Sequence, residues 1–191
     1  MLKLFISTYN ETILIGLIDD LNLIDKNEYQ TLKSHSEFIV PMIKNILDRN
    51  NYNVSNLNEI IVVNGPGSFT GTRLGVTDAK MIAYTLNIPI KTITSIEAIA
   101  LSLPEKNKIV CISDNKGKYI GEFEDNHLTK DIYYVKNELA DQIINNAKYR
   151  VYIDSKIDLE KIIGSIETLP NIAVHSANPV YIKTIEALSD R

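Results

Sequence analysis

The order of hydrophobic and polar residues predicts a chain in which runs of strands are twice followed by helices. Short apolar runs bounded by turn residues indicate strands, and apolar residues repeating every three to four positions indicate helices. We expect strands over residues 2–7, 12–18, 21–24, 60–63, 88–92, 108–113, 119–123, 132–135 and 151–153. We expect helices over residues 34–50, 72–86, 94–103, 138–147 and 178–188.

This order predicts an α/β fold with two lobes, each a mixed sheet with helices. The pattern breaks near Pro104-Glu105-Lys106, which divides a first lobe of residues 1–104 from a smaller second lobe of residues 105–191. The final helix, over residues 178–188, is expected to pack back on the first lobe.

Two of the predicted helices begin with the same local signal. Ser34 and Glu37, like Thr94 and Glu97, are spaced so that each side chain can accept a bond from the other's backbone N–H. We therefore expect a capping box at the start of both helices.

The segment Gly65-Pro66-Gly67-Ser68-Phe69-Thr70-Gly71 lies between a predicted strand and a predicted helix. Such a turn can present free N–H groups to an anion. The segment does not match the Walker loop, because no lysine follows the last glycine, and Thr70 occupies the place of the third Rossmann glycine. It either binds phosphate or lets the next helix pack closely.

The helix after this turn carries small residues at intervals of four. Gly71, Gly75, Ala79 and Ala83 form a stripe on one face, which lets another element approach the helix backbone. That element is either a partner helix or the protein's own sheet.

Composition narrows the possible functions. The chain has 191 residues, a formal net charge of −4 and no cluster of five basic residues, which argues against autonomous nucleic-acid binding. No apolar run approaches the length of a membrane helix, and residues 1–5 enter a strand without a signal peptide, so we expect a cytoplasmic protein.

Candidate catalytic and metal-binding residues are few. The histidines His35, His127 and His175 are far apart in sequence, so no helical metal-binding pair exists. Cys111, the single cysteine, lies among apolar residues and is expected to be buried. Ser68 lacks the surroundings of a nucleophile elbow.

The glycine-rich segment, with Arg73, Gly75, Ala79 and Lys80, resembles the signature of the TsaB family, also called YeaZ. Further matches are His35-Ser36-Glu37 followed by Pro41, Ser95-Ile96-Glu97-Ala98, and Pro179-Val180-Tyr181-Ile182-Lys183. The resemblance covers essentially the whole chain and is densest from residue 35 to residue 100.

The resemblance implies a two-lobed actin-like or Hsp70-like ATPase fold and a place in tRNA modification. That pathway puts a threonylcarbamoyl group on the adenosine next to the anticodon of tRNAs that read codons starting with A. The family's catalytic subunit is TsaD, so the chain is implied to be a non-catalytic scaffold, with TsaE acting in a larger complex. No cofactor is implied, except a nucleotide at a surface shared with partners, and tRNA is implied to bind only through the complex.

The resemblance also implies a docking surface. Helices 34–50 and 72–86 would pair with the same helices of TsaD, or with a second copy of the chain when TsaD is absent. We expect the partner-binding residues to face outward in the monomer: Ile39, Met42, Ile46, Gly71, Gly75, Ala79 and Ala83.

An alternative is an actin-like enzyme with its own ATP site. Such a site needs a carboxylate near the end of the first strand to organise Mg²⁺. Ile6 stands at that place in the chain, which favours the scaffold. The segment Asp114-Asn115-Lys116-Gly117 is either a type I turn or a phosphate-binding hairpin.

Overall fold

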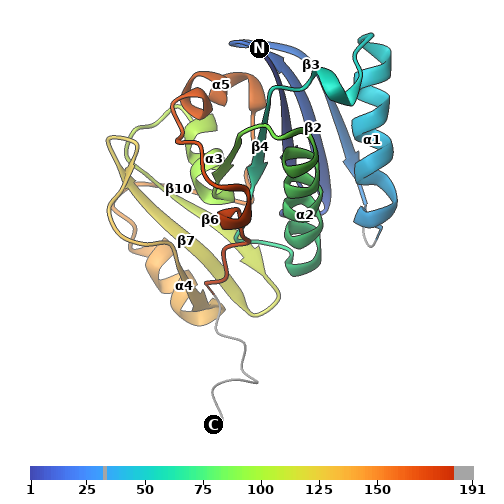
Figure 1. Ribbon diagram of the computed structural model, residues 1–191. Helices are drawn as coiled ribbons and strands as arrows, with labels where there is room; N and C mark the ends of the chain where they lie inside the picture. The colour runs from blue at the N-terminus through green and yellow to red at the C-terminus, as the bar shows by residue number, and fades with distance from the viewer. Residues whose placement is uncertain (32–33, 183–191) are drawn as a thin grey trace.

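A computed structural model describes residues 1–31 and 34–182 (Figure 1). Within these residues the strands form two five-stranded sheets. The first sheet has the order β3-β2-β1-β4-β5, antiparallel among β1, β2 and β3 and parallel from β1 to β5. Its strands are β1 (Leu2–Ser7), β2 (Thr12–Asp19), β3 (Asn22–Gln30), β4 (Glu59–Val63) and β5 (Ile90–Ile93).

The second sheet has the order β10-β6-β7-β8, and β9 also pairs with β7. Its strands are β6 (Lys108–Asp114), β7 (Gly117–Glu124), β8 (His127–Leu128), β9 (Tyr133–Lys136) and β10 (Arg150–Ile153). Helix α4 (Asn137–Asn145) packs on one face of this sheet through a small cluster around Cys111 and Ala140.

Two helices cover one face of the first sheet, α1 (His35–Arg49) and α2 (Phe69–Leu86) (Figure 1). Helices α3 (Ser95–Ser102) and α5 (Leu159–Glu167) share a second core with the opposite face and with β6 and β7. Short 3₁₀ turns, η1 (Val54–Asn56) and η2 (Val174–Ser176), complete the described elements. The expected α/β class with two mixed sheets is confirmed, whereas the lobe boundary at residue 104 stays a prediction.

Several predicted elements differ in length. Strand β3 continues to Gln30, six residues beyond the predicted end, because it pairs with β2 along its whole length. Helix α2 begins at Phe69 rather than residue 72, because the side chain of Ser68 accepts a bond from Gly71 N and caps the helix. The prediction that strand 88–92 begins at residue 88 is also wrong, because β5 begins at Ile90.

Helix α5 was not predicted, although its sequence carries a signal. Leu159, Ile162, Ile163 and Ile166 follow helical spacing and are all buried in the core shared by the two sheets. This helix packs against α3 and against the edge of the first sheet at β2 and β3.

The predicted final helix falls partly outside the described residues, which end at residue 182. Residues 178–182 are not helical. Their backbone instead bonds to the loop after β4: Val180 N donates to Asn64 O at 2.8 Å, and Asn64 Nδ2 donates to Asn178 O at 3.1 Å. We call residues 177–182 the strap.

The two capping signals have different outcomes. At α3, Thr94 and Glu97 form the complete capping box. At α1 the prediction is wrong, because the Ser34 side chain makes no cap bond and the Ser34 backbone N–H donates to Thr31 Oγ1. Ser34 has φ −123° and ψ 35°, away from the extended backbone that Thr94 adopts at its cap.

The expectation that the small-residue stripe faces outward is wrong. Each member of the predicted docking set is buried within the monomer: Ile39, Met42, Ile46, Gly71, Gly75, Ala79 and Ala83. A Cβ atom on Gly71 would overlap Thr8 O, and one on Gly75 would overlap Thr8 Oγ1. The stripe therefore packs on Thr8, the residue after β1, and on the core of the protein's own first sheet.

We expect the double substitution Gly75→Leu with Ala79→Leu to unfold or strongly destabilise the monomer. Overpacking typically costs about 1–3 kcal/mol per site. A Cβ atom at Gly75 would already overlap the Thr8 side chain, and Ala79 is fully buried. Urea unfolding measures the loss, and Thr77→Leu on the exposed side of the same helix is the control. Equal stability of the two variants would contradict the packing.

The capping residues give a second stability prediction. Thr94→Ala should lower the free energy of unfolding by about 1 kcal/mol, because two backbone N–H groups depend on this box. Ser34→Ala should change it by only a few tenths, since the Ser34 side chain makes no cap bond. Thermal unfolding of the two single variants distinguishes them, and similar losses would show that Ser34 caps α1 in solution.

Candidate functional site

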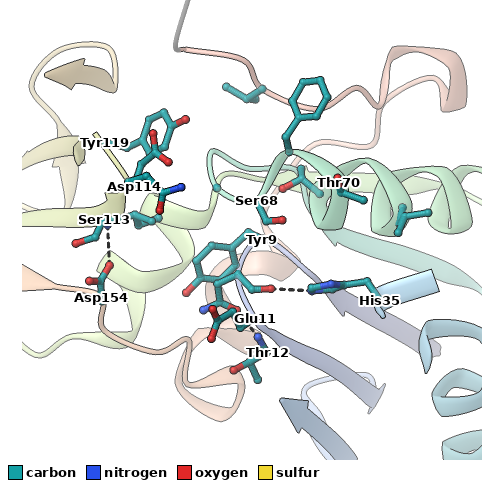
Figure 2. Close-up of a pocket in the computed structure, with 18 of the residues that line it drawn as sticks. Tyr9, Glu11, Thr12, His35, Ser68, Thr70, Ser113, Asp114, Tyr119 and Asp154 are labelled. Carbon is teal, nitrogen blue, oxygen red and sulfur yellow. Dashed lines mark hydrogen bonds between the residues drawn. The ribbon is translucent and has the colours of Figure 1, made fainter. Parts of the chain in front are cut away.

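We call the first sheet with α1 and α2 one half of the molecule, and the second sheet with α4 the other half. A cleft of about 1340 Å³ lies between the two halves (Figure 2). The turn between β1 and β2 (residues 9–12) and the start of α2 line one wall. The turn between β6 and β7 (residues 113–116), with Tyr119 and Asp154, lines the other. Strap residues 180–182 also reach the cleft.

Close packing of the glycine loop accounts for its composition. A Cβ atom on Gly67 would overlap Tyr9 O, and Gly65 has φ +96°, which a side chain disfavours. Ser68 N donates to Tyr9 O at 2.6 Å, and Thr8 Oγ1 donates to Gly71 O at 2.8 Å. The glycines thus seat α2 against the turn between β1 and β2, which favours the packing interpretation over phosphate binding.

Two polar residues near this loop have structural partners. Ser68 Oγ caps α2, which agrees with the absence of a nucleophile-elbow sequence. His35 is buried at the start of α1, and its Nε2 lies 2.8 Å from Asn10 O (Figure 2). Both side chains therefore hold the cleft wall together.

The end of β1 provides no carboxylate. Ile6 is buried in the core beneath α1 and α2, so its side chain does not reach the cleft. Because side chains alternate along a strand, Ser7 lies on the opposite face, the face of Phe5. The position facing the second half of the molecule therefore holds a buried hydroxyl group.

The acidic residues of the opposite wall are engaged in local structure. Asp154 Oδ1 accepts a bond from Ser113 N at 2.7 Å (Figure 2). Asp114 pairs with Gly117 across the hairpin and accepts a bond from Tyr134 Oη at 3.1 Å. In the described part of the chain, no group of three or more His, Cys, Asp or Glu side chains is placed to hold a metal ion.

Burial keeps two ionisable groups neutral. Desolvation, followed by the charge of Asp154, raises the pKa of the Tyr9 phenol well above its usual value. Desolvation also raises the pKa of the Cys111 thiol to about 11, and Cys111 is fully buried, as predicted. Neither group supplies a nucleophile near neutral pH.

An aromatic and cationic cluster lies at the rim. The Arg73 guanidinium lies 3.6 Å from the centre of the Phe69 ring and 5.3 Å from that of Tyr181. Arg73 Nε also donates to Tyr181 Oη at 2.5 Å. This cluster holds the strap on the first turn of α2.

The exposed sides of α1 and α2 carry residues that the sequence analysis missed. Tyr84 is 80% exposed and Met81 is 55% exposed on α2, and Val40 is exposed on α1. The sequence did carry a signal for the exposed residues of α2, because large apolar residues occupy the helix positions opposite the small-residue stripe. Among the described residues no helix is long and apolar enough to span a bilayer.

A family model described as "TsaD: tRNA N6-adenosine threonylcarbamoyltransferase" matches residues 29–148. The protein TsaB of Bacillus subtilis, named for tRNA threonylcarbamoyladenosine biosynthesis, is 37% identical over 52% of this chain and 44% of its own length. The TsaB of Buchnera aphidicola subsp. Baizongia pistaciae is 26% identical over 85% of the chain and 86% of the relative. The chain spans less than two thirds of the B. subtilis relative.

Solved structures support the fold. YeaZ from Pseudomonas aeruginosa superposes with a TM-score of 0.76 at 16% identity, covering 94% of this chain and 99% of that protein. A P. aeruginosa protein with similarity to peptidase YeaZ gives a TM-score of 0.78 at 15% identity, covering 95% and 99%. The family model covers more than half of the chain, which makes the chain similar to TsaD, and both relatives described above are named TsaB, so the chain belongs to the TsaB (YeaZ) family.

Proposed function

We propose that the chain is a non-catalytic subunit in the biosynthesis of threonylcarbamoyladenosine in tRNA. Its relatives are named for this pathway, and the family model is described as the transferase itself. The main support for a non-catalytic role is the glycine loop. Its glycines and the Ser68 cap make contacts within the protein and do not form an open anion site. The proposed role is to support a TsaD-family protein that carries out the transfer in the cytoplasm.

The proposed docking surface is the exposed side of α1 and α2. Tyr84, Met81 and Val40 supply apolar area there, and tyrosine is enriched among residues that dominate binding energy. The buried docking set predicted from the sequence supports this surface from within, by fixing both helices on the first sheet. A TsaE-family ATPase in a larger complex, and a second copy when the chain is alone, complete the proposed partners.

Binding of tRNA is proposed to occur only through the complex. The formal net charge is −4, so the isolated chain lacks the excess of cations on which phosphate-driven binding depends.

A second candidate is an enzyme with its own nucleotide site in the cleft. The observation in its favour is the cleft itself, which is large and lined from both halves of the molecule. An enzyme of this kind would use the acidic side chains that line the cleft. Substitutions of these side chains therefore distinguish an enzyme from a scaffold.

We expect Met81→Asp with Tyr84→Asp to abolish complex formation with the TsaD-like protein of the same organism. Each carboxylate would be buried without a partner in the docked state, while the monomer keeps its fold because both side chains are exposed. Co-expression followed by size-exclusion chromatography measures assembly. Leu139→Asp, at a 49% exposed residue of α4, is the matched control. If the complex still forms with the double variant, the docking surface lies elsewhere on the protein.

The two candidate functions predict different outcomes for Asp114→Asn with Asp154→Asn. Asparagine keeps the accepting oxygens, so threonylcarbamoyl transfer to tRNA by the reconstituted proteins should stay within about twofold of wild type. Omission of the chain should abolish transfer. If the double variant assembles normally but transfer falls by orders of magnitude, the chain contributes catalytic groups and the scaffold proposal fails.

A further inference from the structure

A partly buried carboxylate interrupts an apolar row along α2. Asp78 lies four residues after Leu74 and four residues before Ile82, so the three side chains follow one line on the helix surface. Leu74 and Ile82 are partly buried and pack against the core beneath α1 and α2. Asp78 is thus an acidic residue between two apolar neighbours.

This row lies on the side of α2 that faces α1. The other side of α2 contacts the segment that leads into the strap, because Lys80 Nζ donates to His175 O at 3.2 Å and to Asn178 Oδ1 at 3.3 Å. Successive residues of a helix are about 100° apart, so Asp78, two residues earlier, points away from that side. Helices α1 and α2 lie side by side on the first sheet and contact each other (Figure 1).

The same residue borders the proposed docking surface. Met81 follows Asp78 by three residues, and side chains at this spacing are neighbours on a helix surface. A partner that covers Met81 would therefore also cover Asp78 and remove the water that remains around its carboxylate.

The carboxylate is not used within the monomer. In residues 1–31 and 34–182, the Asp78 side chain forms no hydrogen bond or ion pair. Lys44 of α1 pairs with Asp48 of its own helix, and Lys80 bonds to the segment before the strap. Desolvation raises the pKa of the Asp78 carboxyl above its usual value, because burial disfavours the charged form. The fold gains nothing from this charge.

We propose that Asp78 receives a lysine or arginine of the partner that docks on α1 and α2, and so favours that partner over a second copy of the chain. This inference rests on the docking surface proposed above. A carboxylate covered without a cation is unfavourable, whereas a cation from the partner turns the same group into a charge pair that distinguishes the correct partner from others.

The position of Asp78 disfavours a pair of identical chains. Residues near the two-fold axis of such a pair meet their own copies. Asp78 lies at the middle of α2 (Phe69–Leu86), so two copies of α2 that pair across their middles bring two carboxylates together. Like charges placed against each other suppress the wrong pairing.

One substitution tests both consequences in the full chain. Asp78→Asn keeps the shape of the side chain and removes its charge. The affinity for the TsaD-like protein of the same organism should fall by at least about tenfold, because the partner's cation loses its counter-charge. Self-association should become tighter by about threefold or more, because the repulsion between two carboxylates is lost. Isothermal titration calorimetry measures the first equilibrium and sedimentation equilibrium measures the second, at one ionic strength.

The control is Asp141→Asn, at an exposed residue of α4, which changes the net charge equally and should leave both equilibria unchanged. Thermal unfolding should show Asp78→Asn to be at least as stable as wild type. If Asp78→Asn binds the TsaD-like protein as tightly as wild type or more tightly, this inference is wrong and the docking surface stands. Unchanged or weaker self-association of the variant would refute the selection against a second copy. A wild-type chain that does not bind the TsaD-like protein would overturn the proposed function and this inference together.

Discussion

The close contact between α2 and Thr8, the residue that follows β1, determines the arrangement of the site. Gly71 and Gly75 bring the helix backbone against Thr8, at a separation that leaves no room for a Cβ atom. Because α2 packs this closely, the loop before it lies against the turn between β1 and β2, where Ser68 N donates to Tyr9 O. The cleft wall, the strap and the exposed side of α2 all depend on this contact.

The same contact bears on how a glycine-rich turn should be interpreted. A strand followed by glycines and a helix is typical of phosphate-binding loops, but the pattern does not show what the glycines approach. In this chain they approach Tyr9 and Thr8, and Gly65 lies beside the strap. A strand, a glycine-rich turn and a helix therefore do not by themselves make a nucleotide site, because the site depends on individual side chains.

Much of the fold could be predicted from local spacing, since strands and helices follow from apolar periodicity. The direction in which a face points could not. The stripe from Gly71 to Ala83 was recognised, yet spacing alone does not say whether it meets a partner or the protein's own sheet. Thr94 and Ser34 begin the same capping pattern, but only Thr94 has the extended backbone that the cap requires. The strap depends on bonds to Asn64 from far along the sequence, which no local pattern encodes.

The burial of the stripe changes the requirements on a partner surface. A helix seated through its small residues must present its large ones to solvent, and Tyr84 and Met81 occupy that side. Fully burying one large apolar side chain contributes about 1.5–3 kcal/mol, so two such residues could supply a substantial part of a micromolar affinity. The inner and outer sides of α2 are thus linked. The glycines that pack the stripe against the monomer also hold the helix backbone in place, and an exposed tyrosine on a fixed backbone can serve as a binding anchor.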